Sequence, residues 1–177
     1  MRAIRRLGGL PQARDGVAAV EFALIAPLMI LMYFGIAEFT EAYMAQKRAG
    51  HVASVIADLT SQETALNQDM VDDIFAAGEH IMDPFTATTL SQRLTSIERR
   101  ANGTTAVQWS RTRGSGSFGS TAAIPIPDDV LENGETIIVA EVQYAYTSTA
   151  AELLPGEVTF RSRYYLRPRL TNRITCC

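Results

Sequence analysis

The chain has 177 residues and a formal net charge of −3, with 47% hydrophobic and 20% charged side chains, which fits one modest globular domain with an appendage. The charge is uneven, because residues 1–16 carry four arginines against one acidic side chain and the remainder is acidic. A basic tip on an acidic body argues against nucleic acid as the main partner. It points instead to a tip that a membrane or a targeting system recognises.

An apolar run follows the basic tip. Residues 17–37 comprise 21 residues with a single charge, Glu21. As a helix this run would be about 31 Å long, which matches the ~30 Å hydrocarbon core of a bilayer. Because the arginines precede it, the positive-inside rule predicts a cytoplasmic N-terminus with the rest of the chain on the other side.

Three interpretations of the run compete. A cleaved secretory signal peptide has a shorter apolar region, roughly 7–15 residues. A plain single-span anchor tolerates Glu21 near its end but does not explain it. In a prepilin-type segment, cleavage after Gly16 would leave Val17 as a new N-terminal ammonium, and Glu21 would be the fifth residue of the mature chain. Glu21 would then neutralise an N-terminus inside an apolar helix bundle, where a charge needs a partner. The pattern favours this third interpretation.

Helical periodicity continues beyond the run as an amphipathic pattern to about Leu59. One helix over residues 17–59 would be roughly 65 Å long. A second helix is predicted over 67–82, ended by Pro84. The apolar stripe expected for it consists of Met70, Ile74, Ala77 and Ile81.

Strand patterns fill the second half of the chain. Asn102-Gly103 predicts a hairpin between strands at 89–100 and 104–111, although the leucine spacing in 89–100 leaves a helix open. Residues 112–134 are rich in Gly, Ser and Pro and predict a long loop, with one helical turn near Asp128.

Two further segments, GETIIVAEVQYAYTS and EVTFRSRYYL, alternate with period two around a turn at Pro155-Gly156. The expected fold class is therefore α+β. A long N-terminal helix would pack, together with the second helix, on one face of a small antiparallel sheet of about four strands.

No arrangement of side chains indicates catalysis. His51 and His80 stand alone, and no P-loop, H-E-x-x-H or dinucleotide-binding motif occurs. We expect no enzymatic activity, cofactor, metal or small-molecule substrate. Four arginines near the C-terminus form a basic patch, either a solvated sheet face or a contact for an acidic neighbouring subunit: Arg161, Arg163, Arg167 and Arg169.

The two cysteines, Cys176 and Cys177, are adjacent. Neighbouring Cα atoms are about 3.8 Å apart, below the usual disulfide range of roughly 4.4–6.8 Å. Three states stay open: an exposed pair of free thiols, a strained disulfide between the two, or disulfides between chains in an oxidising compartment.

The segment RDGVAAVEFALIAPLMILMYFGIAEF resembles the N-terminal signature of TadE-like proteins, which are minor pilins or pseudopilins of the Flp/Tad (tight adherence) type IV pilus system. The stretches AVQWS, IVAEVQYAY and YYLRPRLTNRITC are similar to the body of the same family, less specifically. The resemblance implies cleavage between Gly16 and Val17 by an inner-membrane aspartyl prepilin peptidase. It also implies that Glu21 is the fifth-position glutamate of the mature pilin, followed by Phe22.

These expectations divide the chain into a cytoplasmic leader (1–16), a transmembrane and stalk helix (17–60) and a periplasmic α+β head (61–177). The expected partners are the prepilin peptidase, other pilins and pilus assembly proteins, and the inner membrane, which the chain would cross once. A head of this size argues against the major filament subunit and favours initiating, capping or anchoring a pilus. The competing hypothesis is an uncleaved single-span inner-membrane protein with a periplasmic binding or assembly domain.

Overall fold

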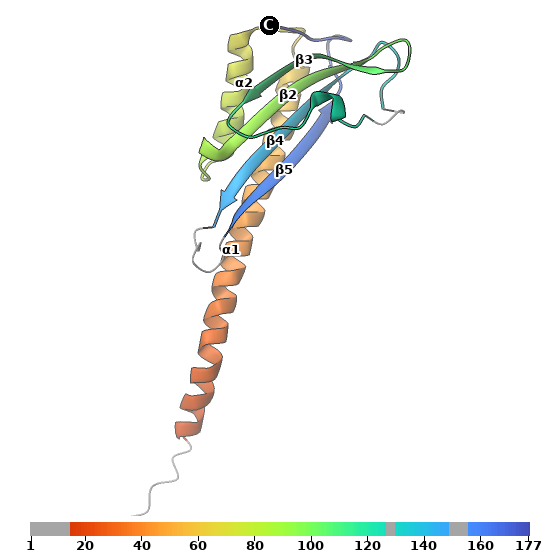
Figure 1. Ribbon diagram of the computed structural model, residues 1–177. Coiled ribbons are helices and arrows are strands. Elements are labelled where there is room, and N and C mark those ends of the chain that lie inside the picture. Colours follow the sequence, from red (N-terminus) through yellow and green to blue (C-terminus); the bar gives the residue numbers. More distant parts are fainter. Residues whose placement is uncertain (1–14, 127–129, 149–155) are drawn as a thin grey trace, which may run out of the picture. The chain divides into compact units, whose positions relative to one another are not determined.

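The computed structural model describes residues 15–126, 130–148 and 156–177. The chain forms two compact units, Met1–Thr40 and Glu41–Cys177. The elements, labelled in Figure 1, are α1 (Asp15–Ser61), β1 (Ala65–Leu66), α2 (Gln68–Ile81), a 3-10 helix (Ala87–Thr89), β2 (Leu90–Arg99), β3 (Thr105–Arg113), a 3-10 helix (Thr121–Ala123), β4 (Thr136–Thr147), β5 (Glu157–Leu166) and β6 (Thr175–Cys176).

The first unit consists, in its described part, of the N-terminal portion of α1. The sequence here is rich in Ala, Leu and Met, which are strong helix formers. Pro27 lies inside the helix and lacks the backbone N–H that would bond one turn back. The helix nevertheless continues through it, so one lost hydrogen bond does not end an otherwise favourable run.

The second unit is built on a four-stranded sheet in the order β3-β2-β4-β5, with every neighbouring pair antiparallel. The predicted hairpin is confirmed, and residues 90–99 are a strand rather than a helix. Gly103 takes the positive φ of 79° that the turn requires. Asn102 Oδ1 accepts a hydrogen bond of 3.1 Å from the backbone N–H of Thr104.

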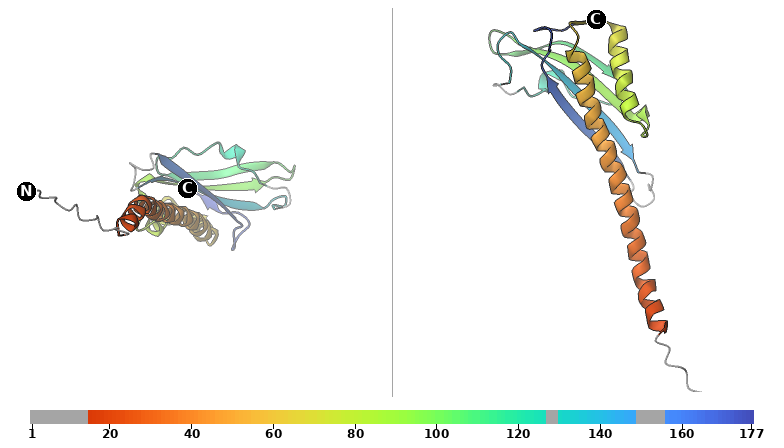
Figure 2. Two further views of the ribbon diagram at one scale, coloured as in Figure 1. Left: turned by 90° about the horizontal axis from the view of Figure 1, so that it is seen from below. Right: turned by 180° about the vertical axis from the view of Figure 1, so that it is seen from behind.

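One face of the sheet carries the main core. The C-terminal part of α1 and α2 both lie on this face, as the end-on and rear views in Figure 2 show. The expected α+β architecture is therefore confirmed. Five alternate residues of β4 point into this core as the period-two pattern predicted: Ile138, Ala140, Val142, Tyr144 and Tyr146.

The α2 helix begins at the expected place, because Asn67 caps it by accepting a hydrogen bond of 2.8 Å from the backbone N–H of Met70. Its buried face differs from the predicted stripe. Met70, Ala77 and Ile81 are only half buried. The fully buried positions are Val71, Ile74, Phe75 and Gly78. The helix is rotated because it sits on both α1 and the sheet, which the sequence of α2 alone does not specify.

The opposite face of the sheet is also partly covered, which the strand patterns did not predict. The segment between β3 and β4 packs a second, smaller apolar cluster onto it, formed by Ile97, Ile124, Leu131, Ile137 and Val139. Central strand β2 is consequently buried on both faces. The expected helical turn near Asp128 lies outside the described residues.

A small two-stranded parallel sheet, β1 with β6, closes the C-terminal end of this unit. Trp109 Nε1 donates a hydrogen bond of 2.8 Å to the carbonyl oxygen of Ile174, which is fully buried. The backbone N–H of Arg169 donates one of 2.9 Å to the carbonyl oxygen of Ser61. Strands of two residues have no periodicity, so sequence reasoning missed them.

The closest approach of α2 to its neighbours gives a first prediction. A Cβ added at Gly78 would lie 2.1 Å from Gln92 Oε1 and 3.0 Å from Val52 Cγ1. Gln92 cannot easily move, since it is buried and its Nε2 donates to the carbonyl oxygen of Phe75 at 3.0 Å. We expect Gly78→Ala to lower the free energy of unfolding by about 1–2 kcal/mol, the overpacking cost less the gain in helix propensity.

Gly50 in α1 supplies a matched control, because its added Cβ would meet only Ser162 Oγ at an ordinary 3.6 Å. Gly50→Ala should therefore raise stability by up to about 1 kcal/mol. Urea titration of the full chain in detergent, followed by fluorescence of Trp109, the one tryptophan, measures both. Equal effects of the two substitutions would contradict the close packing at Gly78.

Candidate functional site

The residues expected to be processed lie in the first turns of α1. Gly16, Val17, Glu21 and Phe22 are all exposed. Val17 and Glu21 are four residues apart in a helix, so they share one face about 6 Å apart. A helical glutamate also leans toward the N-terminus of its helix. Glu21 is therefore placed beside the turn that contains the backbone nitrogen of Val17.

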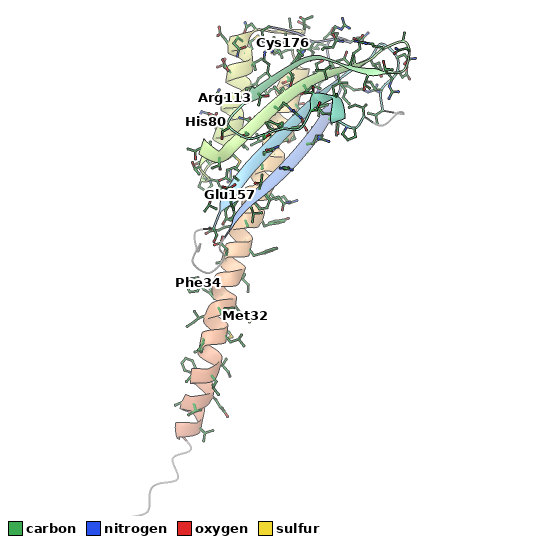
Figure 3. All side chains as sticks on the ribbon, in the orientation of Figure 1. Met32, Phe34, His80, Arg113, Glu157 and Cys176 are labelled. Carbon is green, nitrogen blue, oxygen red and sulfur yellow. The ribbon has the colours of Figure 1, made fainter. Side chains whose placement is uncertain are left out.

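The surface around these residues is apolar on every side of the helix. From Val17 to Phe39, the large apolar side chains that lie on this surface are between 50% and 74% exposed. Figure 3 shows them projecting in all directions, with Met32 and Phe34 labelled. By length and composition, α1 is able to cross a membrane. A surface of this kind needs lipid or other apolar helices around it.

Comparison with known families gives a match for this helix. Residues 16–58 match the family model described as TadE-like protein. Over this N-terminal segment the chain is similar to TadE-like proteins. The match begins at Gly16 and stays within α1, so it says nothing of the sheet. No curated protein and no solved structure matches the chain.

This similarity, together with the exposed apolar helix, fits a protein associated with the Tad pilus and with a membrane. The resemblance inferred from the residues 14–39 is thereby confirmed at the level of the family. Cleavage, orientation and the roles of Gly16, Val17, Glu21 and Phe22 stay predictions.

The chain presents no metal centre in the ranges that the structure describes. No group of three or more His, Cys, Asp or Glu side chains comes together there in a way that could hold an ion. His51 lies on α1 and His80 at the end of α2, where a basic side chain favours the helix dipole.

The two C-terminal thiols are free and differ from each other. Cys176 pairs with Leu66 across the small sheet, and the Cys177 backbone N–H donates to the Leu66 carbonyl oxygen at 3.3 Å. Burial raises the pKa of the Cys176 thiol to about 11. The pKa of Cys177 is lowered, because the Cys176 thiol and the Arg111 guanidinium donate to its thiolate. The disulfide between the two cysteines and the disulfides between chains, the other two of the three states, stay open.

These opposite shifts predict selective alkylation. At pH 8, only about one in a thousand Cys176 side chains would be the reactive thiolate at a pKa of about 11. Cys177 should react first, at a lower pH than a free cysteine. Arg111→Gln should slow it by removing the cation that stabilises the thiolate. Mass spectrometry after timed iodoacetamide treatment locates the label, and Arg100→Gln is the control. Faster labelling of Cys176 would refute the assignment.

A buried ion cluster on the sheet was missed by sequence reasoning. Glu141 on β4 is 6% exposed, although its alternation predicted a solvated position. Its Oε2 accepts from Arg93 Nε at 2.6 Å, and its Oε1 accepts from Arg163 Nε at 2.9 Å and Nη2 at 2.7 Å. The Arg93 guanidinium also lies 4.8 Å from the Phe118 ring centre and donates to the carbonyl oxygen of Gly119 at 2.6 Å.

The cluster clamps three strands and the loop after β3 to one another. Register explains it, since Glu141 pairs with Arg93 on one side and Arg163 on the other. The sequence contained a signal, namely opposite charges at alternating positions of neighbouring strands. It could not be used without the register.

Proposed function

We propose that the chain is a minor pilin or pseudopilin of a Tad-type pilus. A prepilin peptidase cleaves it between Gly16 and Val17, and the mature protein initiates, assembles or anchors the filament. The observation that carries the proposal is the position of Glu21. It is an acid within an exposed apolar helix, five residues after Gly16 and one turn from Val17, in the segment that matches the TadE-like family.

The physical argument rests on pairing. Cleavage after Gly16 creates an ammonium group at Val17. An ammonium and a carboxylate inside an apolar bundle are each costly alone and tolerable together. Glu21 is near enough to meet the ammonium of its own chain or of a neighbour. Before assembly, the same helix rests in the inner membrane, with the N-terminus cytoplasmic and the head periplasmic, as the positive-inside rule predicts.

Extraction into a filament then exchanges lipid for neighbouring helices. Lipid tails are as apolar as these side chains, so replacing lipid by helices gives no hydrophobic gain. Close packing between the helices therefore drives their association. The exposed side chains of the first unit supply this surface. We assign the chain a structural role and no enzymatic one. The size of Glu41–Cys177 favours a minor position over that of the main subunit.

The second candidate is an uncleaved single-span protein whose head binds or assembles periplasmic components. The same helix satisfies this alternative, because a membrane span needs only length and composition. This alternative does not explain why Glu21 lies five residues after Gly16, so we rank it second.

Co-expression with and without the cognate prepilin peptidase separates the two. We expect the membrane-resident protein to begin at Val17 with the peptidase and at Met1 without it. Gly16→Leu should block the change, whereas Gly9→Leu in the leader should not. Retention of Met1 in the presence of active peptidase would favour the uncleaved tether.

A further inference from the structure

In the part of the chain that the structure describes, strand β5 has a free edge and carries two arginines that line a cavity. It is the last strand of the sheet order, so every second backbone N–H and C=O group points away from β4. Figure 1 shows β5 along that border. A cavity of about 210 Å³ lies over β4 and β5, under the loop after β3, with Arg161, Arg163 and Gln143 among its walls. We name it the arginine cavity.

The arginine cavity has an excess of positive charge. Glu141 is its acidic wall, and both carboxylate oxygens already accept from guanidinium groups. One carboxylate thus compensates two arginines, Arg93 and Arg163. Within the described residues, Arg161 makes no ion pair. Among the charged walls of the cavity and the Arg93 that pairs with them, there are three guanidinium groups and one carboxylate, which suits an incoming anion.

The positively charged wall is held in place before any ligand arrives. Arg163 is fixed by Glu141 and donates from Nη1 to the Tyr165 hydroxyl at 3.4 Å. Tyr165 in turn donates to the carbonyl oxygen of Pro125 at 3.1 Å. A fixed guanidinium loses little freedom on binding, so a carboxylate gains more from it. Glu141 is the organiser of this wall rather than a ligand.

The spacing of the two accessible arginines specifies an extended ligand. Arg161 and Arg163 are two residues apart on one strand, so they lie on the same face about 6.6 Å from each other. An added strand repeats this spacing for its own residues i and i+2. Two acidic side chains separated by one residue would therefore face Arg161 and Arg163 in register.

The other face of β5 specifies the residues between the acids. Val158 is 52% and Tyr164 is 43% exposed there, which is unusual for residues of the core-facing side. Residues of an added strand that alternate with the acids would lie against these two side chains. Glu157, on the same face as the arginines, would repel an acid placed at its end of the strand.

We propose that β5 binds an extended segment of a partner protein in which apolar and acidic residues alternate. Two carboxylates face Arg161 and Arg163, and the apolar residues cover Val158 and Tyr164. Backbone hydrogen bonds to the β5 edge supply affinity, and the arginine cavity supplies specificity. The proposal goes beyond the pilin function and does not depend on processing at Gly16.

The test uses the full chain in detergent and a fluorescent peptide, Thr-Val-Glu-Val-Glu-Val-Thr-Val-Thr, which in antiparallel register places Val opposite both Tyr164 and Val158. Anisotropy should show saturable binding that weakens as salt is raised. A peptide with Gln in place of both Glu should bind with an affinity at least roughly tenfold lower, as expected for lost charge-assisted hydrogen bonds. Equal binding of the two peptides, or no binding of either, would overturn the proposal.

Variants locate the site. Arg161→Gln should lower the affinity for the acidic peptide by a similar factor. It should leave the fold intact, because Arg161 is exposed. Arg100→Gln removes the same charge from the β2–β3 turn and should change nothing. An Arg161→Gln protein that binds as well as Arg100→Gln would contradict the assignment.

Two further measurements test the strand geometry. Hydrogen exchange should show protection of β5 backbone amides on addition of the peptide. Glutarate, which offers two carboxylates without a backbone, should compete only at far higher concentration. Glutarate binding as tight as that of the peptide, or unchanged β5 exchange, would show an isolated anion site and refute strand addition.

Discussion

Replacing Glu141 by glutamine is expected to lower the free energy of unfolding by about 3 kcal/mol. The side chain of Arg93 is 7% exposed and would keep its charge in the interior without a carboxylate. The glutamine amide would also direct N–H donors at guanidinium donors. We place the effect at the lower end of the range for broken buried pairs, because the Arg163 side chain is 37% exposed and stays partly hydrated.

Denaturation of the full chain in detergent, followed by Trp109 fluorescence, measures this loss. Glu157→Gln is the matched control, since Glu157 is an exposed acid on the neighbouring strand. Its effect should stay within about 0.5 kcal/mol. If the two substitutions cost the same, the ion cluster contributes nothing to the stability of the head.

Replacing Glu21 by glutamine is expected to leave processing intact and to reduce incorporation into pili by tenfold or more. The reason is the unpaired ammonium at Val17, which would have to enter an apolar bundle without a counter-charge. Loss of one partner of a buried pair costs about 3–5 kcal/mol, and each 1.4 kcal/mol is about a tenfold change in an equilibrium.

Quantifying the protein in membranes and in sheared pili distinguishes assembly from processing. Glu63→Gln, which removes an acid outside the apolar segment, should behave as the unaltered protein. Normal incorporation of the Glu21→Gln protein would mean that the acid has another purpose. If the Glu21→Gln protein stayed uncleaved, Glu21 would be needed for recognition by the peptidase rather than for packing in the filament.

The sequence predicted the elements of this chain well where periodicity is strong. The apolar run, the α2 helix and the strands β4 and β5 each extend over several periods and form where expected, although α2 buries a different face from the predicted stripe. The Asn102-Gly103 turn resolved the one ambiguous segment, because a hairpin needs the positive φ that glycine supplies.

What the sequence did not predict depends on contacts between elements. The rotation of α2 is set by the close approach at Gly78 to Val52 and Gln92. The burial of Glu141 depends on strand register, and the arginine cavity depends on the loop that places Phe118 beside Arg93. Pairwise geometry of this kind is absent from any single segment.

The candidate processing site, in contrast, does not depend on contacts between elements. Gly16, Val17, Glu21 and Phe22 could be selected from sequence because their spacing along the chain is itself the signal. The structure adds that Val17 and Glu21 share a helix face and that the surrounding apolar surface is exposed.

The account therefore depends on whether the mature chain with Val17 at its end enters the filament. Peptides from sheared, carbodiimide-treated pili should contain this protein beginning at Val17, with its α-amino group joined to the carboxyl group of Glu21 from the same or a neighbouring copy. Recovery of the protein only from membranes, with Met1 at its N-terminus in cells that hold active peptidase, would contradict the account.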